Sequence, residues 1–133
     1  MAHADEVVRA RRAVAGAAAS ALLCGLLASD PARAQSVPVA PAEIRDKWSG
    51  RTLQGRTPGG AAVAMSFKSD GKAELSGAAS DTGTWRVSDN GYCTTWNRIR
   101  AGQERCFTVR RAAGRIEVFN PDGSLSGSFD DLP

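Results

Sequence analysis

The most reactive side chains in this chain are two cysteines, Cys93 and Cys106, within the stretch GYCTTWNRIRAGQERCF. Cysteines act as nucleophiles, redox pairs, metal ligands or disulfide partners. A redox pair usually has the spacing Cys-x-x-Cys at a helix start, which this pair lacks. A metal site needs further ligands, and the only histidine is His3, near the N-terminus. The pattern therefore favours a structural disulfide.

The other side chains offer little for catalysis. Without a histidine after His3, the chain lacks the usual general base of Ser-His-Asp and Cys-His sites and a common zinc ligand. Paired carboxylates could serve a glycosidase, but Asp70, Asp89 and Asp122 precede Gly or Asn in turn sequences, where such side chains cap the backbone. Neither a calcium loop nor a phosphate-binding loop is present. We expect a protein that is not an enzyme and that uses no cofactor or metal.

Residues 1–34 have the three parts of a secretory signal peptide. A basic stretch, RARR, precedes an uncharged run rich in Ala and Leu, and Ala32 and Ala34 frame a small-residue cleavage site before Gln35. The run is shorter and less apolar than the about 20 residues of a membrane helix. A bulky leucine before Cys24 disfavours acylation there. We expect cleavage after Ala34 and a periplasmic or secreted protein, where disulfides persist.

Residues 35–133, the expected mature chain, carry nearly balanced charge. Their 13 Lys and Arg against 11 Asp and Glu give a net charge of +2. Basic and aromatic residues do not interleave as in a nucleic-acid stacking platform. We expect no nucleic-acid partner and no stable membrane insertion after signal cleavage. The length fits one small domain.

From Trp48 onward, short runs alternate apolar and polar residues, and Asp-Gly and Asn-Gly turn sequences separate several of them. This pattern predicts antiparallel hairpins, with about eight strands in residues 48–133. No long helix is available to cover the apolar face, so the sheet must close on itself. We expect an all-β fold, a small up-and-down barrel of lipocalin-like form, with a β-sandwich as the alternative. The inward-facing set includes Phe67, Trp85, Val109 and Val118.

Residues 35–47 precede the expected barrel. The stretch QSVPVAPA contains two prolines and no apolar period, which indicates an extended tail. Pro41 then opens PAEIRDKW, which predicts one short helical turn leading into Trp48.

A hairpin in which Cys93 lies opposite Cys106 has a defined register. Its inner face carries Tyr92 and Trp96, and Arg105 falls on the same face near the open end of the hairpin. A charged side chain that points inward must be paired with an opposite charge or lie at a solvent-filled opening of the barrel. Two interpretations stay open for Arg105, a rim arginine that packs over Trp96 or an arginine that faces a ligand. The candidate ligand or partner surface consists of Trp48, Tyr92, Trp96 and Arg105.

Four short motifs follow one another along the chain: Gly-Thr-Trp at 83–85, Cys-x-x-Trp at 93–96, a Cys before an aromatic residue at 106–107, and Asp-Gly at 122–123. With these motifs, about half of the expected mature chain resembles a family of small secreted bacterial domains of unknown function. The resemblance implies a lipocalin-like barrel and a bond between Cys93 and Cys106, and it implies no activity. A looser resemblance is to periplasmic protease inhibitors, which are small disulfide-linked barrels with an N-terminal trunk.

Two classes of non-enzymatic function remain open. One is an envelope-accessory domain that binds another protein, including a protease-inhibitor-like barrel, because an extended tail could dock in a partner's cleft. The other is a carrier of a small apolar ligand inside the barrel. Short loops at the barrel mouth would leave little to cap a cavity, which favours the protein partner.

The expected signal peptide leads to the first testable prediction. The exported protein begins at Gln35 and carries no lipid, because Ala32 and Ala34 form a favourable cleavage site and the bulky residue before Cys24 disfavours acylation. The intact mass of the exported form measures this directly. A species acylated at Cys24 would contradict it.

Overall fold

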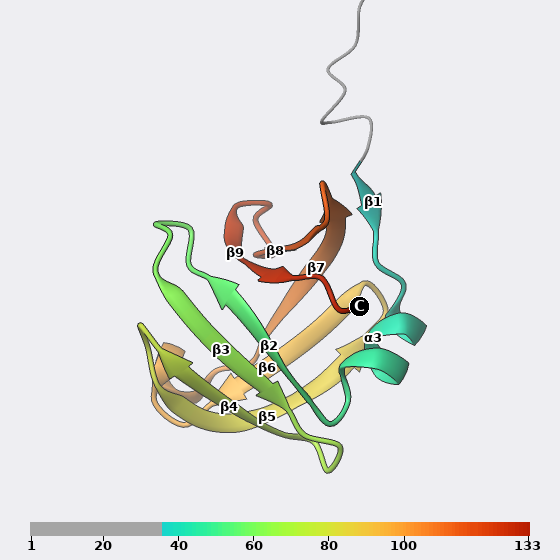
Figure 1. Ribbon diagram of the computed structural model, residues 1–133. Coiled ribbons are helices and arrows are strands. Elements are labelled where there is room, and N and C mark those ends of the chain that lie inside the picture. Colours follow the sequence, from blue (N-terminus) through green and yellow to red (C-terminus); the bar gives the residue numbers. More distant parts are fainter. Residues whose placement is uncertain (1–35) are drawn as a thin grey trace, which may run out of the picture. The chain divides into compact units, whose positions relative to one another are not determined.

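Eight strands form a closed antiparallel barrel, as the sequence predicts, in the computed structural model, which describes residues 36–133 (Figure 1). In chain order they are β2 (Arg51–Arg56), β3 (Ala62–Phe67), β4 (Lys72–Gly77), β5 (Asp81–Ser88), β6 (Gly91–Trp96), β7 (Arg105–Ala112), β8 (Arg115–Phe119) and β9 (Leu125–Asp130). Each strand pairs with the next, and β9 pairs with β2 to close the ring. The expected signal sequence, Cys24 and the cleavage site at Ala34 lie outside the described residues.

Helix α3 (Pro41–Trp48) lies at one end of the barrel (Figure 1). It begins with the proline that the sequence indicates, but it has eight residues instead of one turn. Its side chains Ile44 and Trp48 are fully buried. The Trp48 ring lies 5.2 Å from Phe67 and 5.6 Å from Tyr92, measured between ring centroids. This end of the barrel is therefore filled by aromatic packing.

The segment before α3 lies on the barrel, which corrects the expectation of a free tail. Strand β1 (Val37–Pro38) pairs with the part of β7 that β6 does not reach. The Val39 N–H donates a hydrogen bond to the Val109 carbonyl at 2.9 Å, and the Val39 side chain is buried. The Arg110 guanidinium donates to the hydroxyl and carbonyl oxygens of Ser36. The segment is extended, as predicted, but its backbone is occupied.

A charged cluster fastens α3 and the end of the chain to β7. The Arg111 guanidinium donates to the carboxylates of Glu43 in α3 and of Asp131 after β9. These hydrogen bonds, that of Asp131 foremost, raise the pKa of Arg111 above its ordinary value. All three side chains are partly buried, so solvent screens this cluster less than it screens a surface ion pair.

The predicted inward set is confirmed for Phe67, Val109 and Val118, which are buried. Trp85 packs against this core but is only partly buried, and its Nε1 donates to the Lys68 carbonyl at 2.8 Å. The core is thus mainly apolar, with Thr94 as a buried polar residue, and it becomes more polar where Trp85 meets a turn.

The disulfide between Cys93 and Cys106 is present, and it joins β6 to β7 in the predicted register. Tyr92 lies opposite Phe107 and Thr94 opposite Arg105, so Tyr92 and Thr94 are on the buried side. A disulfide fits an oxidising compartment. Within residues 36–133, no helix has both the length and the apolar character needed to cross a membrane.

The disulfide gives a prediction about stability. Replacing both cysteines with alanine lowers the free energy of unfolding by about 2–4 kcal/mol, because the bond closes a loop in the unfolded chain. Urea denaturation of the variant and of the oxidised and reduced wild type measures the loss. The far-UV spectrum stays that of a β protein, since the barrel ladder does not need the bond. A loss below about 1 kcal/mol would show that the unfolded chain is not constrained in this way.

Candidate functional site

The end of the barrel opposite α3 contains a cavity of about 180 Å³. It lies where β2, β4, β6 and β8 end, beneath the connections to the following strands. Most of its lining is apolar, with large contributions from Met65, Tyr92, Trp96, Phe107 and Phe129. The broader hollows on the outer surface are lined mainly by polar and charged side chains. We therefore take this cavity, the open-end cavity, as the candidate site.

The predicted site residues divide between the two ends of the barrel. Tyr92 and Trp96 line the open-end cavity, and both are nearly buried. Trp48, the last residue of α3, is only 1% exposed and packs against aromatic side chains of the core. The prediction that it belongs to a ligand or partner surface is therefore wrong. Arg105 is exposed, does not line the cavity, and has its Nη1 3.5 Å from Asn120 Oδ1. Arg105 thus does not face the cavity.

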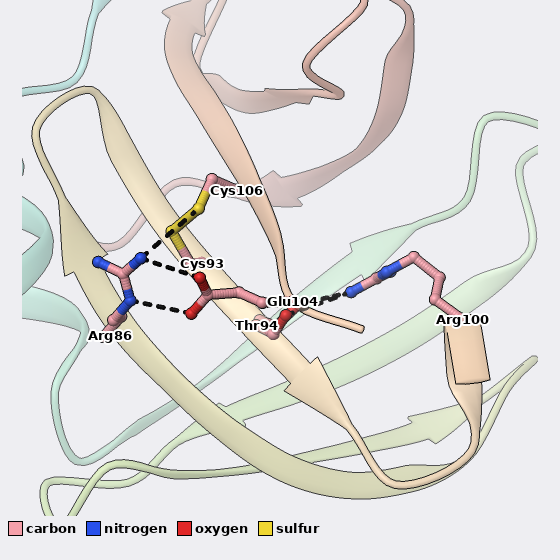
Figure 2. The surroundings of a disulfide bond; sticks show 6 residues. All are labelled: Arg86, Cys93, Thr94, Arg100, Glu104 and Cys106. Atoms are coloured by element: carbon pink, nitrogen blue, oxygen red, sulfur yellow. Dashed lines mark hydrogen bonds and ion pairs between the residues drawn. A yellow bond between two sulfur atoms is a disulfide. The ribbon is translucent and has the colours of Figure 1, made fainter. Parts of the chain in front are cut away.

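Two charged side chains from residues 36–133 reach the cavity, Arg56 and Arg100, and sequence analysis assigned a role to neither; Arg100 is the one that lies over the aromatic lining. It lies in the short 3₁₀ helix η2 (Ile99–Gly102) between β6 and β7. Its Nη2 donates to the hydroxyl of Thr94 at 2.9 Å, as Figure 2 shows. The guanidinium carbon lies 5.6 Å from the centroid of the Phe107 ring, a cation–π distance. Arg100 Nε is buried and has no hydrogen-bond partner.

The sequence alone does not single out Arg100, because arginines in turns usually point into solvent. One feature of the sequence does indicate an unusual turn: the connection, residues 97–104, is longer than a tight hairpin needs. The expectation of short mouth loops was therefore wrong for this connection. Its extra residues allow the chain to fold back over the cavity.

The backbone of this connection is strained. Arg100 and Ala101 have φ values of 56° and 53°, in the left-handed region that L-residues other than glycine rarely adopt. Such conformations cost about 1–3 kcal/mol each and persist only where the surroundings impose them.

The carboxylate of Asp81, at the start of β5, anchors the connection. Its Oδ2 accepts hydrogen bonds from the backbone N–H groups of Ile99 at 2.8 Å and Arg98 at 2.9 Å. Its Oδ1 accepts one from the Thr82 N–H. These bonds, that of Ile99 foremost, hold the pKa of Asp81 below its ordinary value, although burial acts in the opposite direction. Asp81 is only 5% exposed, so its bonds are shielded from competing water.

The electrostatic environment of the open-end cavity is positive. Arg56 and Arg100 contribute to the lining, and no Asp or Glu from the described part of the chain does. Burial, followed by the like charge of Arg105, lowers the pKa of Arg100. Burial raises the pKa of the Tyr92 hydroxyl, and the charge of Arg100 offsets part of that rise. Tyr92 therefore stays neutral at physiological pH.

The outer face of the same hairpin has a different arrangement. Arg86 donates to both carboxylate oxygens of Glu104, at 2.9 and 3.0 Å, beside the disulfide (Figure 2). The Glu104 carboxylate and the sulfurs of Cys93 and Cys106 lie close enough together to suggest metal ligation. Both sulfurs are bonded to each other and Glu104 is held by Arg86, so this group is a structural clamp in its oxidised form.

No family model, no curated protein and no solved structure matches this chain. The function must therefore be argued from the geometry of the open-end cavity.

The anchoring role of Asp81 predicts a pH-dependent effect. Asp81→Asn lowers the free energy of unfolding at neutral pH by about 1–3 kcal/mol, because the amide cannot accept from all three N–H groups. The folded pKa is below the unfolded value, so the contribution of Asp81 is fully present above about pH 4 and is lost as pH falls through the folded pKa. The difference between wild type and variant therefore shrinks in acid.

Urea denaturation at about pH 7 and about pH 3 measures this difference, with Asp89→Asn in an exposed turn as the matched control. The control changes stability by less than about 0.5 kcal/mol. An Asp81→Asn effect of the same size at both pH values would contradict the anchoring role.

Proposed function

We propose that this protein is a non-enzymatic binding domain that holds one small, largely apolar molecule in the open-end cavity. The observation that carries the proposal is the combination of an apolar lining with one end closed by Trp48 and the other covered by a strained connection. A barrel of eight strands has just enough room either to be filled by its own side chains or to keep one small ligand. Here the aromatic packing stops short of the open end.

The strain at Arg100 and Ala101 supports a binding role over a purely structural one. A connection that only joined β6 to β7 could use glycine at both left-handed positions and avoid the cost. Instead Asp81 holds the strained segment so that Arg100 lies over the cavity. Positioning a polar group at the entrance of an apolar cavity is typical of small-molecule sites.

The arrangement of the N-terminal segment argues against docking of a free tail in a partner's cleft. Ser36 and Val39 are bonded to β7, and Val39 is buried. Removing this segment would uncover part of β7 as well as delete the segment itself. We therefore rank small-ligand binding above a protein partner.

We further propose that the protein acts in the periplasm or after secretion. The signal-peptide pattern of residues 1–34 and the disulfide between Cys93 and Cys106 support this location.

A cavity-filling variant tests the proposed function. Val63 lines the cavity from β3, so Val63→Phe puts a ring into the space and lowers ligand affinity by about tenfold or more. Ligand-observed NMR with benzyl alcohol, 1-hexanol, benzoate and hexanoate measures binding to purified protein. Gln54→Phe, on the outer face of β2, adds a ring outside the cavity and is the matched control.

The control keeps wild-type binding. Binding of none of the four compounds to wild type, or equal binding to Val63→Phe, would defeat the proposal. Turnover of a substrate that a single side-chain change abolishes would defeat its non-enzymatic part.

A further inference from the structure

The positive charge inside the open-end cavity has no negative partner among residues 36–133. Among residues 36–133, none of the ion pairs includes Arg100. Glu104, which directly precedes β7, is already paired with Arg86 on the outer face. A partly buried cation without a counterion is unfavourable, because burial removes water without replacing it by an opposite charge.

The hydrogen bonds of the Arg100 guanidinium are also incomplete. Nη2 donates to Thr94, which fixes the plane of the group over Phe107. Nε is buried without an acceptor, and an unsatisfied buried donor destabilises the folded protein. A guanidinium presents its donors as a rigid fork that matches the two oxygens of a carboxylate. Nε itself is enclosed by protein atoms, whereas Nη1 is not buried and receives no hydrogen-bond partner from residues 36–133, so a planar anion in the cavity is the acceptor that suits Nη1 best.

The size of the cavity limits the rest of the ligand. Its volume is about 180 Å³. An apolar cavity of about 150 Å³ in another protein accommodates benzene. The lining from Tyr92, Trp96 and Phe129 is aromatic, which suits a flat or compact apolar body. A long acyl chain would not fit, since the aromatic packing around Trp48 closes the other end.

We propose that the open-end cavity binds a small monocarboxylate with a compact apolar body, about the size of benzoate, and that Arg100 binds its carboxylate. This inference rests on the proposed function of the cavity and adds the chemical class of the ligand. Arg56, which lines the cavity and whose Nη1 donates to the Gly60 carbonyl, and Arg105, whose charge acts on Arg100, add to the positive potential around Arg100.

The test compares a charged ligand with a neutral one of the same shape. Benzoate and benzyl alcohol are titrated by isothermal calorimetry into wild type, Arg100→Met, Arg100→Lys and Arg105→Met. Arg100→Met weakens benzoate binding about tenfold or more and changes benzyl alcohol binding by less than about threefold. Arg100→Lys keeps part of the benzoate affinity, because the charge remains and the fork geometry is lost. Arg105→Met, the matched control, weakens benzoate binding by less than about threefold.

Thermal unfolding separates a binding role of Arg100 from a structural one. Without ligand, Arg100→Met is at least as stable as wild type, since it removes a partly buried charge with an unsatisfied donor. Benzoate raises the unfolding temperature of wild type but not that of the variant. A variant that is less stable and still binds benzoate as wild type does would assign Arg100 a structural role and overturn the inference.

The remaining outcomes distinguish the inference from the proposed function. Equal affinity of wild type for benzoate and benzyl alcohol, both lost in Val63→Phe, would overturn the monocarboxylate and leave the binding domain intact. Benzoate binding that survives Val63→Phe would place the anion outside the cavity and overturn the inference. Binding of neither compound would defeat both proposals.

Discussion

The packing of Trp48 against Phe67, Tyr92 and Phe129 determines where this barrel is full and where it is hollow. The three ring centroids lie 5.2, 5.6 and 5.9 Å from that of Trp48, within the range of favourable aromatic contacts. Because helix α3 supplies this tryptophan from outside the sheet, one end of the barrel gains a large side chain that no strand provides. This packing does not extend to the other end, where the open-end cavity remains.

Several parts of the chain hold α3 in the position that this packing requires. Arg111 joins Glu43 of α3 to Asp131 near the C-terminus, and β1 extends the sheet just before the helix begins. The disulfide joins β6 to β7, where Tyr92 and Phe107 face each other across the core. Stability is thus concentrated around the closed end and the β6–β7 pair, while the connection between these two strands carries the strain.

The open end, in contrast, contains features that lower the stability of the folded protein. Arg100 is partly buried with an unsatisfied Nε, and its backbone and that of Ala101 are left-handed. Asp81 makes this arrangement persist through hydrogen bonds to the connection. Strained backbone and an unpaired charge both lower the stability of the folded protein, and a single substitution could remove either of them. Features of this kind that persist are typical of binding sites. The inferred carboxylate ligand supplies the counterion that Arg100 lacks among residues 36–133.

The sequence by itself determined the local features of this protein. Period-two alternation and turn sequences predicted about eight antiparallel strands, because both depend on short-range backbone preferences, and the absence of a long helix favoured a closed barrel while leaving a β-sandwich as the alternative. The register of the β6–β7 hairpin followed from placing Cys93 opposite Cys106, and the alternation agreed with it. The sequence did not identify the residues of the candidate site correctly. Trp48 and Arg105 were assigned to it, while Arg100 was missed. Which aromatic side chain fills the core, and which arginine turns inward, depends on contacts between residues distant in sequence: Trp48 with the strands it meets, and Asp81 with the connection it holds. Such contacts leave no periodic trace in the chain, so only the tertiary structure decided them.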